Sequence, residues 1–208
     1  MNTVQRFIFA VTAAGAAATG LVAAPLKFDF KDPKGVNNIQ FRIDAPLEST
    51  SGQGTGITGE VTFDPAAPAA TVGRIVLATS SLTVGNSTMQ GHLQGPMWLD
   101  AAKNPEIVFE AKSLAAATTT GTTTKADVTG VLTLHGVSKE ITVPVTLTYL
   151  PGKLGDRFGK PEMKGDLLVL RASFSVNRSD FGIMPGKMTD KVAEHVDLSL
   201  SLAGAAPQ

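Results

Sequence analysis

Apolar and polar residues alternate along most of the chain between residues 39 and 202. The clearest stretch is 140–149, in which isoleucine, valine, leucine or tyrosine occupies every second position. One apolar face and one polar face is typical of a strand in an antiparallel sheet with one buried side. We therefore expect an all-β fold. The further segments with this two-residue period are 39–44, 57–63, 74–77, 106–112, 127–134 and 196–202.

Some segments fall outside the alternating pattern. Segment 166–177 contains Leu-Leu-Val-Leu, which is apolar on both faces, so this strand needs cover on both sides or lies at a subunit contact. Residues 135–138 predict a tight hairpin, and the Thr/Ala-rich residues 115–125 predict a long hairpin tip. Short helical or irregular segments are expected near 87–104 and 178–189.

About eight strands with short connections predict a closed barrel or a sandwich. No linker divides residues 25–208, so we expect one domain there. An eight-stranded barrel is either filled by its own side chains or wide enough for one slender ligand. Large aromatic residues are few, with 10 Phe, 1 Trp and 1 Tyr, which favours neither a filled core nor a ligand tunnel decisively.

The first 24 residues have the order of a secretory leader. Arg6 is their only charged residue, an apolar run follows at 7–11, and small residues end at Ala23 and Ala24. The apolar run is too short to span a bilayer. We therefore predict a signal peptide at 1–24 and a periplasmic or secreted protein.

Charge and composition exclude several kinds of chemistry. The 18 basic and 18 acidic residues give no net charge, which argues against a nucleic-acid partner. The chain has no cysteine and only 3 histidines, well separated, so disulfides, thiol catalysis and a metal site are not expected. No nucleophile elbow, phosphate loop or paired catalytic carboxylates occur. We expect no catalytic residues, no metal and no enzymatic activity.

Basic residues gather in one stretch of this neutral chain. Residues 151–191 hold eight basic and five acidic side chains. Such a stretch is ordinarily a solvated loop. The alternative is a positive rim for an anionic head group, with arginine supplying paired hydrogen bonds.

Four motifs in order carry a family resemblance. Residues 58–65 read Thr-Gly-Glu-Val-Thr-Phe-Asp-Pro, and 92–109 contain His-Leu, Trp-Leu-Asp and Asn-Pro-Glu-Ile-Val-Phe. Residues 130–139 read Gly-Val-Leu-Thr-Leu-His-Gly-Val-Ser-Lys, and 177–183 read Asn-Arg-Ser-Asp-Phe-Gly-Ile. Together they resemble the YceI family of lipocalin-like polyisoprenoid-binding proteins over most of residues 26–202.

The resemblance implies an extended eight-stranded antiparallel barrel whose apolar interior holds a long isoprenoid chain. It also implies a periplasmic, non-enzymatic, often dimeric carrier. We expect a homodimer and transient contact with a membrane. The motif residues that it singles out are His92, Asp100, Arg178, Asp180 and Phe181. The chain departs from the family pattern at 36–38 and 46–48, where two expected histidines are missing.

We therefore hypothesise an exported barrel that holds a polyisoprenoid or isoprenoid quinone and needs no other cofactor. His92, Trp98 and Arg178 would surround the opening of the cavity. The rival is a ligand-free structural or stress-related protein that partners a membrane redox protein. The residues expected to contact the ligand are Ile39, Phe41, Ile43, Ile57, Val61, His92, Trp98, Leu132, Val145, Leu147, Phe174, Arg178 and Phe181.

Overall fold

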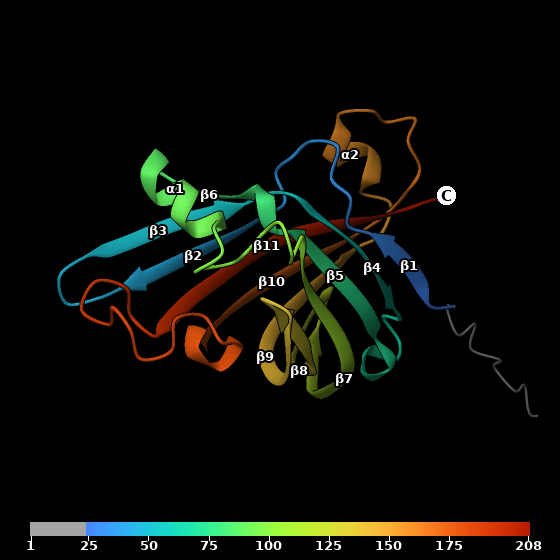
Figure 1. The fold of residues 1–208 in the computed structure, drawn as a ribbon. Coiled ribbons are helices and arrows are strands. Elements are labelled where there is room, and N and C mark those ends of the chain that lie inside the picture. The colour runs from blue at the N-terminus through green and yellow to red at the C-terminus, as the bar shows by residue number, and fades with distance from the viewer. Residues whose placement is uncertain (1–23) are drawn as a thin grey trace, which may run out of the picture.

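A computed structural model describes residues 24–208 of the protein (Figure 1). The predicted signal peptide lies outside the described residues except for its last residue, Ala24. Eight strands form an antiparallel ring that closes where β1 pairs with β11, with Asp29 opposite Ala205. In ring order they are β1 (Leu26–Asp29), β4 (Ile57–Phe63), β5 (Val72–Ala78), β7 (Glu106–Thr120), β8 (Thr123–Leu134), β9 (Val137–Leu150), β10 (Gly165–Asn177) and β11 (His195–Pro207). The expected eight-stranded barrel is thus confirmed.

Three more strands extend the sheet beyond β11. β2 (Asn38–Asp44) pairs with the first half of β11, and β3 (Ser49–Gly54) and β6 (Leu82–Val84) follow in order. The side chain of Gln90 covers the last strand, because its Nε2 donates to Leu82 O (2.8 Å) and its Oε1 accepts from Val84 N (2.9 Å). These two bonds replace a neighbouring strand along this edge.

Helical structure among residues 24–208 is short. α1 (Ser87–Gln94) begins where the Asn86 side chain accepts hydrogen bonds from two backbone N–H groups, and α2 (Leu154–Phe158) follows β9. Three 3-10 turns complete the set: η1 (Pro68–Ala70), η2 (Thr79–Ser81) and η3 (Arg178–Phe181). The expected segment 87–104 is helical only in its first half, and 178–189 only in its first four residues. No helix in this part of the chain is long and apolar enough to cross a membrane.

The segment 115–125 is not a long hairpin tip. β7 continues to Thr120 and β8 begins at Thr123, so the turn is only Gly121 and Thr122. The threonines pair across the two strands because β-branched residues suit a sheet, and Gly121 takes the positive φ of +59° that the turn needs.

The doubly apolar start of β10 is covered by the chain itself. Leu167 and Leu168 are only 5% and 0% exposed, and Leu154 of α2 is 1% exposed. α2 lies against both β10 and β11 at this end of the barrel (Figure 1). These leucines therefore offer no surface for a subunit contact.

Candidate functional site

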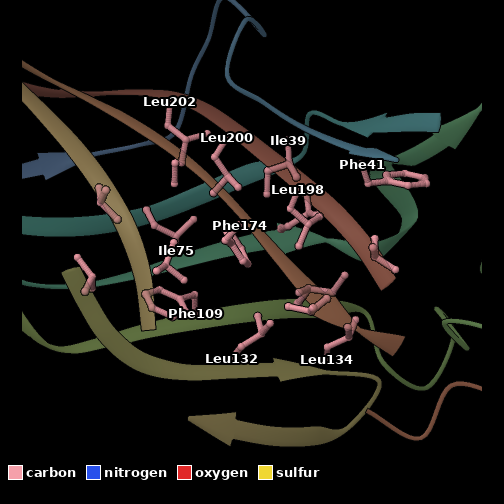
Figure 2. Close-up of a pocket in the computed structure, with 18 of the residues that line it drawn as sticks. Ile39, Phe41, Ile75, Phe109, Leu132, Leu134, Phe174, Leu198, Leu200 and Leu202 are labelled. Carbon is pink, nitrogen blue, oxygen red and sulfur yellow. The ribbon is translucent and has the colours of Figure 1, made fainter. Parts of the chain in front are cut away.

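The barrel encloses an apolar cavity of about 230 Å³. Only Thr71, Trp98 and Arg178 bring a polar side-chain group to its wall. Figure 2 shows side chains from opposite walls pointing into the same space, including Leu198 and Leu200 from β11 and Leu132 from β8. This arrangement follows from the two-residue period, since alternate residues of each strand face the interior.

Glycines let two of the phenylalanines lie along the wall. Phe41 pairs directly with Gly52, and its ring occupies the place that a Gly52 side chain would take. The Phe109 ring lies over Gly130 in the same way, 2.6 Å from where a Cβ would stand. Because these rings cover backbone instead of filling the centre, the interior stays open despite its aromatic lining.

The cavity is closed at the end that carries α2, which we call the α2 end. Two cavity residues in the parts of β9 and β11 that lead to this end, Leu147 and Leu202, are only 2% and 1% exposed. Beyond them lie Phe28 and Phe63, whose rings contact Tyr149 at centroid distances of 6.2 and 6.3 Å. Water has no wide path to the cavity through this packed layer.

A buried carboxylate ties this aromatic layer to the neighbouring loop. Tyr149 Oη donates to Asp166 Oδ2 and Gly152 N donates to Asp166 Oδ1, both at 2.7 Å. Burial, the hydrogen bond to Asp166 and its negative charge raise the pKa of Tyr149 to about 12. Asp166 is 5% exposed, and these bonds satisfy its two oxygens inside the protein.

A second polar cluster holds the loop between β1 and β2 at the α2 end. Asn37 is 2% exposed; its side chain donates to Phe30 O (3.0 Å) and accepts from Ala203 N (2.8 Å). The Asp32 carboxylate accepts three backbone N–H groups of the same loop and faces Arg157 at 3.1 Å. Burial opposes ionisation, but the N–H bonds and Arg157 outweigh it and lower the pKa of Asp32.

The opposite end, which carries α1, we call the α1 end. Here cavity residues such as Ile43, Trp98 and Val196 are partly exposed, in contrast to the buried residues of the α2 end. The Arg178 guanidinium lies 5.7 Å from the centre of the Trp98 ring. This cation–π contact joins the loop after α1 to η3 across the end of the cavity.

Arg178, the first residue of η3, holds the loop 182–194 in place. It is 3% exposed, and all five of its N–H groups donate to backbone carbonyl oxygens. Glu194 Oε1 lies 3.3 Å from its Nη2 and balances its charge. Hydrogen bonds from Ser179 and Gly186, together with Arg178, lower the pKa of Glu194. No N–H group of Arg178 is left for a ligand head group. The carbonyl oxygens that it bonds belong to Ile183, Met184, Lys187, Val192 and Ala193.

The structure brings most of the predicted residues together around one cavity. Ile57 is buried in the core without lining the cavity, and Phe181, the last residue of η3, is buried outside the lining. His92 is exposed on α1 and lies outside the lining. The predicted residues that line the cavity are Ile39, Phe41, Ile43, Val61, Trp98, Leu132, Val145, Leu147, Phe174 and Arg178.

Several lining residues were missed because they come from short or irregular segments. Leu93, Leu99 and Ile183 reach the cavity from α1, the loop after it and the loop after η3. Irregular segments have no period that assigns a side chain to the interior. The one signal for these residues was that they lie close in the sequence to Trp98 or Arg178, which were expected at the opening. In residues 24–208, no group of three or more potential metal ligands occurs.

The fold and the cavity define an extended, lipocalin-like antiparallel β-barrel with an apolar interior. The family model for the YceI-like domain matches residues 32–203 of the sequence, and the chain belongs to the YceI family. The UPF0312 protein of Pseudomonas putida strain W619 is 34% identical over 146 residues, which cover 70% of this chain and 68% of that protein.

Two solved structures share the barrel. BcnA of Burkholderia cenocepacia has a TM-score of 0.66 at 23% identity, covering 80% of this chain and 95% of that one. A polyisoprenoid-binding domain of Saccharophagus degradans, implicated in plant cell wall breakdown, has a TM-score of 0.62 at 12% identity, covering 88% and 99%. At these identities the likeness concerns the fold.

Proposed function

We propose that the barrel binds one long apolar lipid, a polyisoprenoid or an isoprenoid quinone, and carries it without chemical change. The observation that carries this proposal is the open apolar interior between a sealed α2 end and a partly exposed α1 end. The polyisoprenoid-binding neighbour supports the same ligand class. Burial of about 300 Å² of apolar ligand surface would contribute on the order of 7 kcal/mol.

The lipid tail lies against Leu147 and Leu202, and the polar head group stays near Trp98 at the α1 end. At the sealed end, the polar groups of Asp166 and Asn37 are already bonded within the protein and are not available to a head group. Burying an unpaired polar group is costly, so the apolar tail enters first. We further propose export to the periplasm or beyond and function as a homodimeric carrier.

The experiment is organic extraction of natively purified protein followed by mass spectrometry. We expect about one polyisoprenoid-type lipid per barrel. Ala172→Phe places a large ring in the cavity and should empty it, whereas Ser173→Phe, at the next and exposed position of β10, should keep the lipid. Equal loading of the two folded variants, or no lipid in the unchanged protein, would favour the ligand-free rival.

A further inference from the structure

Among residues 24–208, three of the five most exposed large hydrophobic side chains belong to loops at the α1 end. They are Leu47 in the β2–β3 turn, Met97 after α1 and Met188 in the loop 182–194, at 68%, 64% and 46% exposure. We call these three residues the apolar tips. Single exposed hydrophobic residues are ordinary, but several beside the opening of an apolar cavity need an explanation.

Direct contacts link the three loops. Leu47 N donates to Asp190 O (2.9 Å), which joins the β2–β3 turn to the loop that carries Met188. The same loop is held by Arg178, whose guanidinium stacks on Trp98, the neighbour of Met97. Figure 1 shows the β2–β3 turn, α1 and the loop after η3 at the end opposite to α2 and the C-terminus. The apolar tips therefore lie around one end of the barrel.

The charges beside the apolar tips balance, since Lys187 and Asp190 on either side of Met188 have opposite signs and other charges nearby are paired. Lys191 lies 3.9 Å from Glu48, and Arg178 lies 3.3 Å from Glu194. Paired charges lower the cost of bringing this end out of bulk water, and they leave little net field for steering a charged partner. Apolar contact, and not charge, is the interaction that this end offers.

We infer that the apolar tips dock the α1 end on the surface of a lipid bilayer. This inference rests on the proposed function, because a bilayer is where a carried polyisoprenoid would be taken up and released. Flexible methionine side chains suit disordered acyl chains. The three side chains can bury far less surface than the roughly 1,000 Å² of a specific protein complex. That area is enough for weak, reversible insertion into a bilayer surface.

Trp98 provides the probe, since it is the single tryptophan of the chain and follows Met97 directly. The protein is mixed with vesicles of phosphatidylcholine and phosphatidylglycerol that carry bromine on their acyl chains. We expect a blue shift and quenching of the Trp98 emission, with little change between low and high salt. Sedimentation with the vesicles gives the bound fraction independently.

The test variant replaces the three apolar tips together: Leu47→Gln, Met97→Gln and Met188→Gln. We expect about tenfold weaker partitioning onto the vesicles, because the buried apolar area is lost. The matched control is Val36→Gln with Val72→Gln, two residues that are 52% and 50% exposed and lie outside the three loops. The control should bind vesicles like the unchanged protein, and both variants should keep the melting temperature.

Loading with polyisoprenol from detergent micelles separates this inference from the proposed function. If docking is right, the triple variant loads normally from micelles but slowly from vesicles. Vesicle binding by the triple variant equal to that of the control would overturn the docking inference, whatever the cavity holds. Absence of vesicle binding by the unchanged protein would also overturn it. Failure of loading from micelles in every variant would instead count against the proposed function.

Discussion

The two ends of the barrel are held by different kinds of interaction. At the α2 end, the fully buried rings of Phe28 and Phe30 are backed by Asn37 and Asp166, whose polar groups are bonded to backbone and Tyr149. At the α1 end, one residue, Arg178, organises an irregular loop by bonding five backbone carbonyls. The first end is sealed by packing, whereas at the second end an irregular loop held by Arg178 lies beside partly exposed cavity residues.

The largest effect is expected at the sealed end. Phe28→Ala removes a ring that is 0% exposed and leaves a cavity, so the free energy of unfolding should fall by about 3–5 kcal/mol. Chemical denaturation measures this change. Phe174→Ala, at a partly exposed lining position, serves as the comparison and should cost clearly less. Equal losses would mean that the two ends are packed alike.

A smaller and local effect is expected at Arg178. Arg178→Ala leaves five carbonyl oxygens without their donor, and we expect a loss of about 3 kcal/mol. Hydrogen exchange should quicken in residues 182–194 and stay slow in β10 near Asp166. Arg178→Lys should not restore protection, because an ammonium group has three N–H donors. Uniform quickening throughout the barrel would contradict a separate α1 end.

A substitution at Gly130, in the barrel wall between the two ends, tests whether the Phe109 ring sets the width of the cavity. A Cβ there would stand 2.6 Å from the Phe109 ring and 2.5 Å from the Glu110 carbonyl oxygen. Gly130→Ala should therefore cost about 1–2 kcal/mol and turn the ring into the cavity, lowering lipid loading. Adding Phe109→Leu should restore loading, although the strain against Glu110 remains. Normal loading of Gly130→Ala alone would show that the ring does not set the cavity width.

A pH dependence is expected at the α2 end. The pKa of Tyr149 is raised to about 12 in the folded protein from 10 in the unfolded chain. Between these values the unfolded chain loses its proton first, so the stability from this group is complete below pH 10 and declines toward pH 12. Denaturation series across this range compare the protein with Tyr149→Phe, which should lack this part of the decline. Identical curves would show that Tyr149 does not contribute to this decline in stability.

The parts that the sequence predicts well are those with a regular period. Val145 and Leu147 were assigned to the interior because every second residue of their strand is apolar, and they line the cavity. β3 was missed because its sequence, Ser-Thr-Ser-Gly-Gln-Gly, has no apolar face and is held by pairing with β2. α2 was missed because five residues are too few to show a helical period.

The function of single residues was harder to predict than the fold. Arg178 was expected at the opening and lines the cavity there, but the bonds of its N–H groups to carbonyls up to 15 residues further along an irregular loop were not foreseen. His92 was expected at the opening, but α1 presents it to solvent. Such contacts depend on the path of irregular loops, which no short-range pattern specifies.

The most direct test of the account locates the lipid tail inside the barrel. A polyisoprenol with a photoreactive diazirine at its tail end is loaded from micelles and irradiated, and the cross-linked peptides are identified by mass spectrometry. The account predicts cross-links to interior positions beside the sealed end, chiefly Leu147 and Leu202. Cross-links confined to outward-facing residues, or to Trp98 at the α1 end, would contradict it.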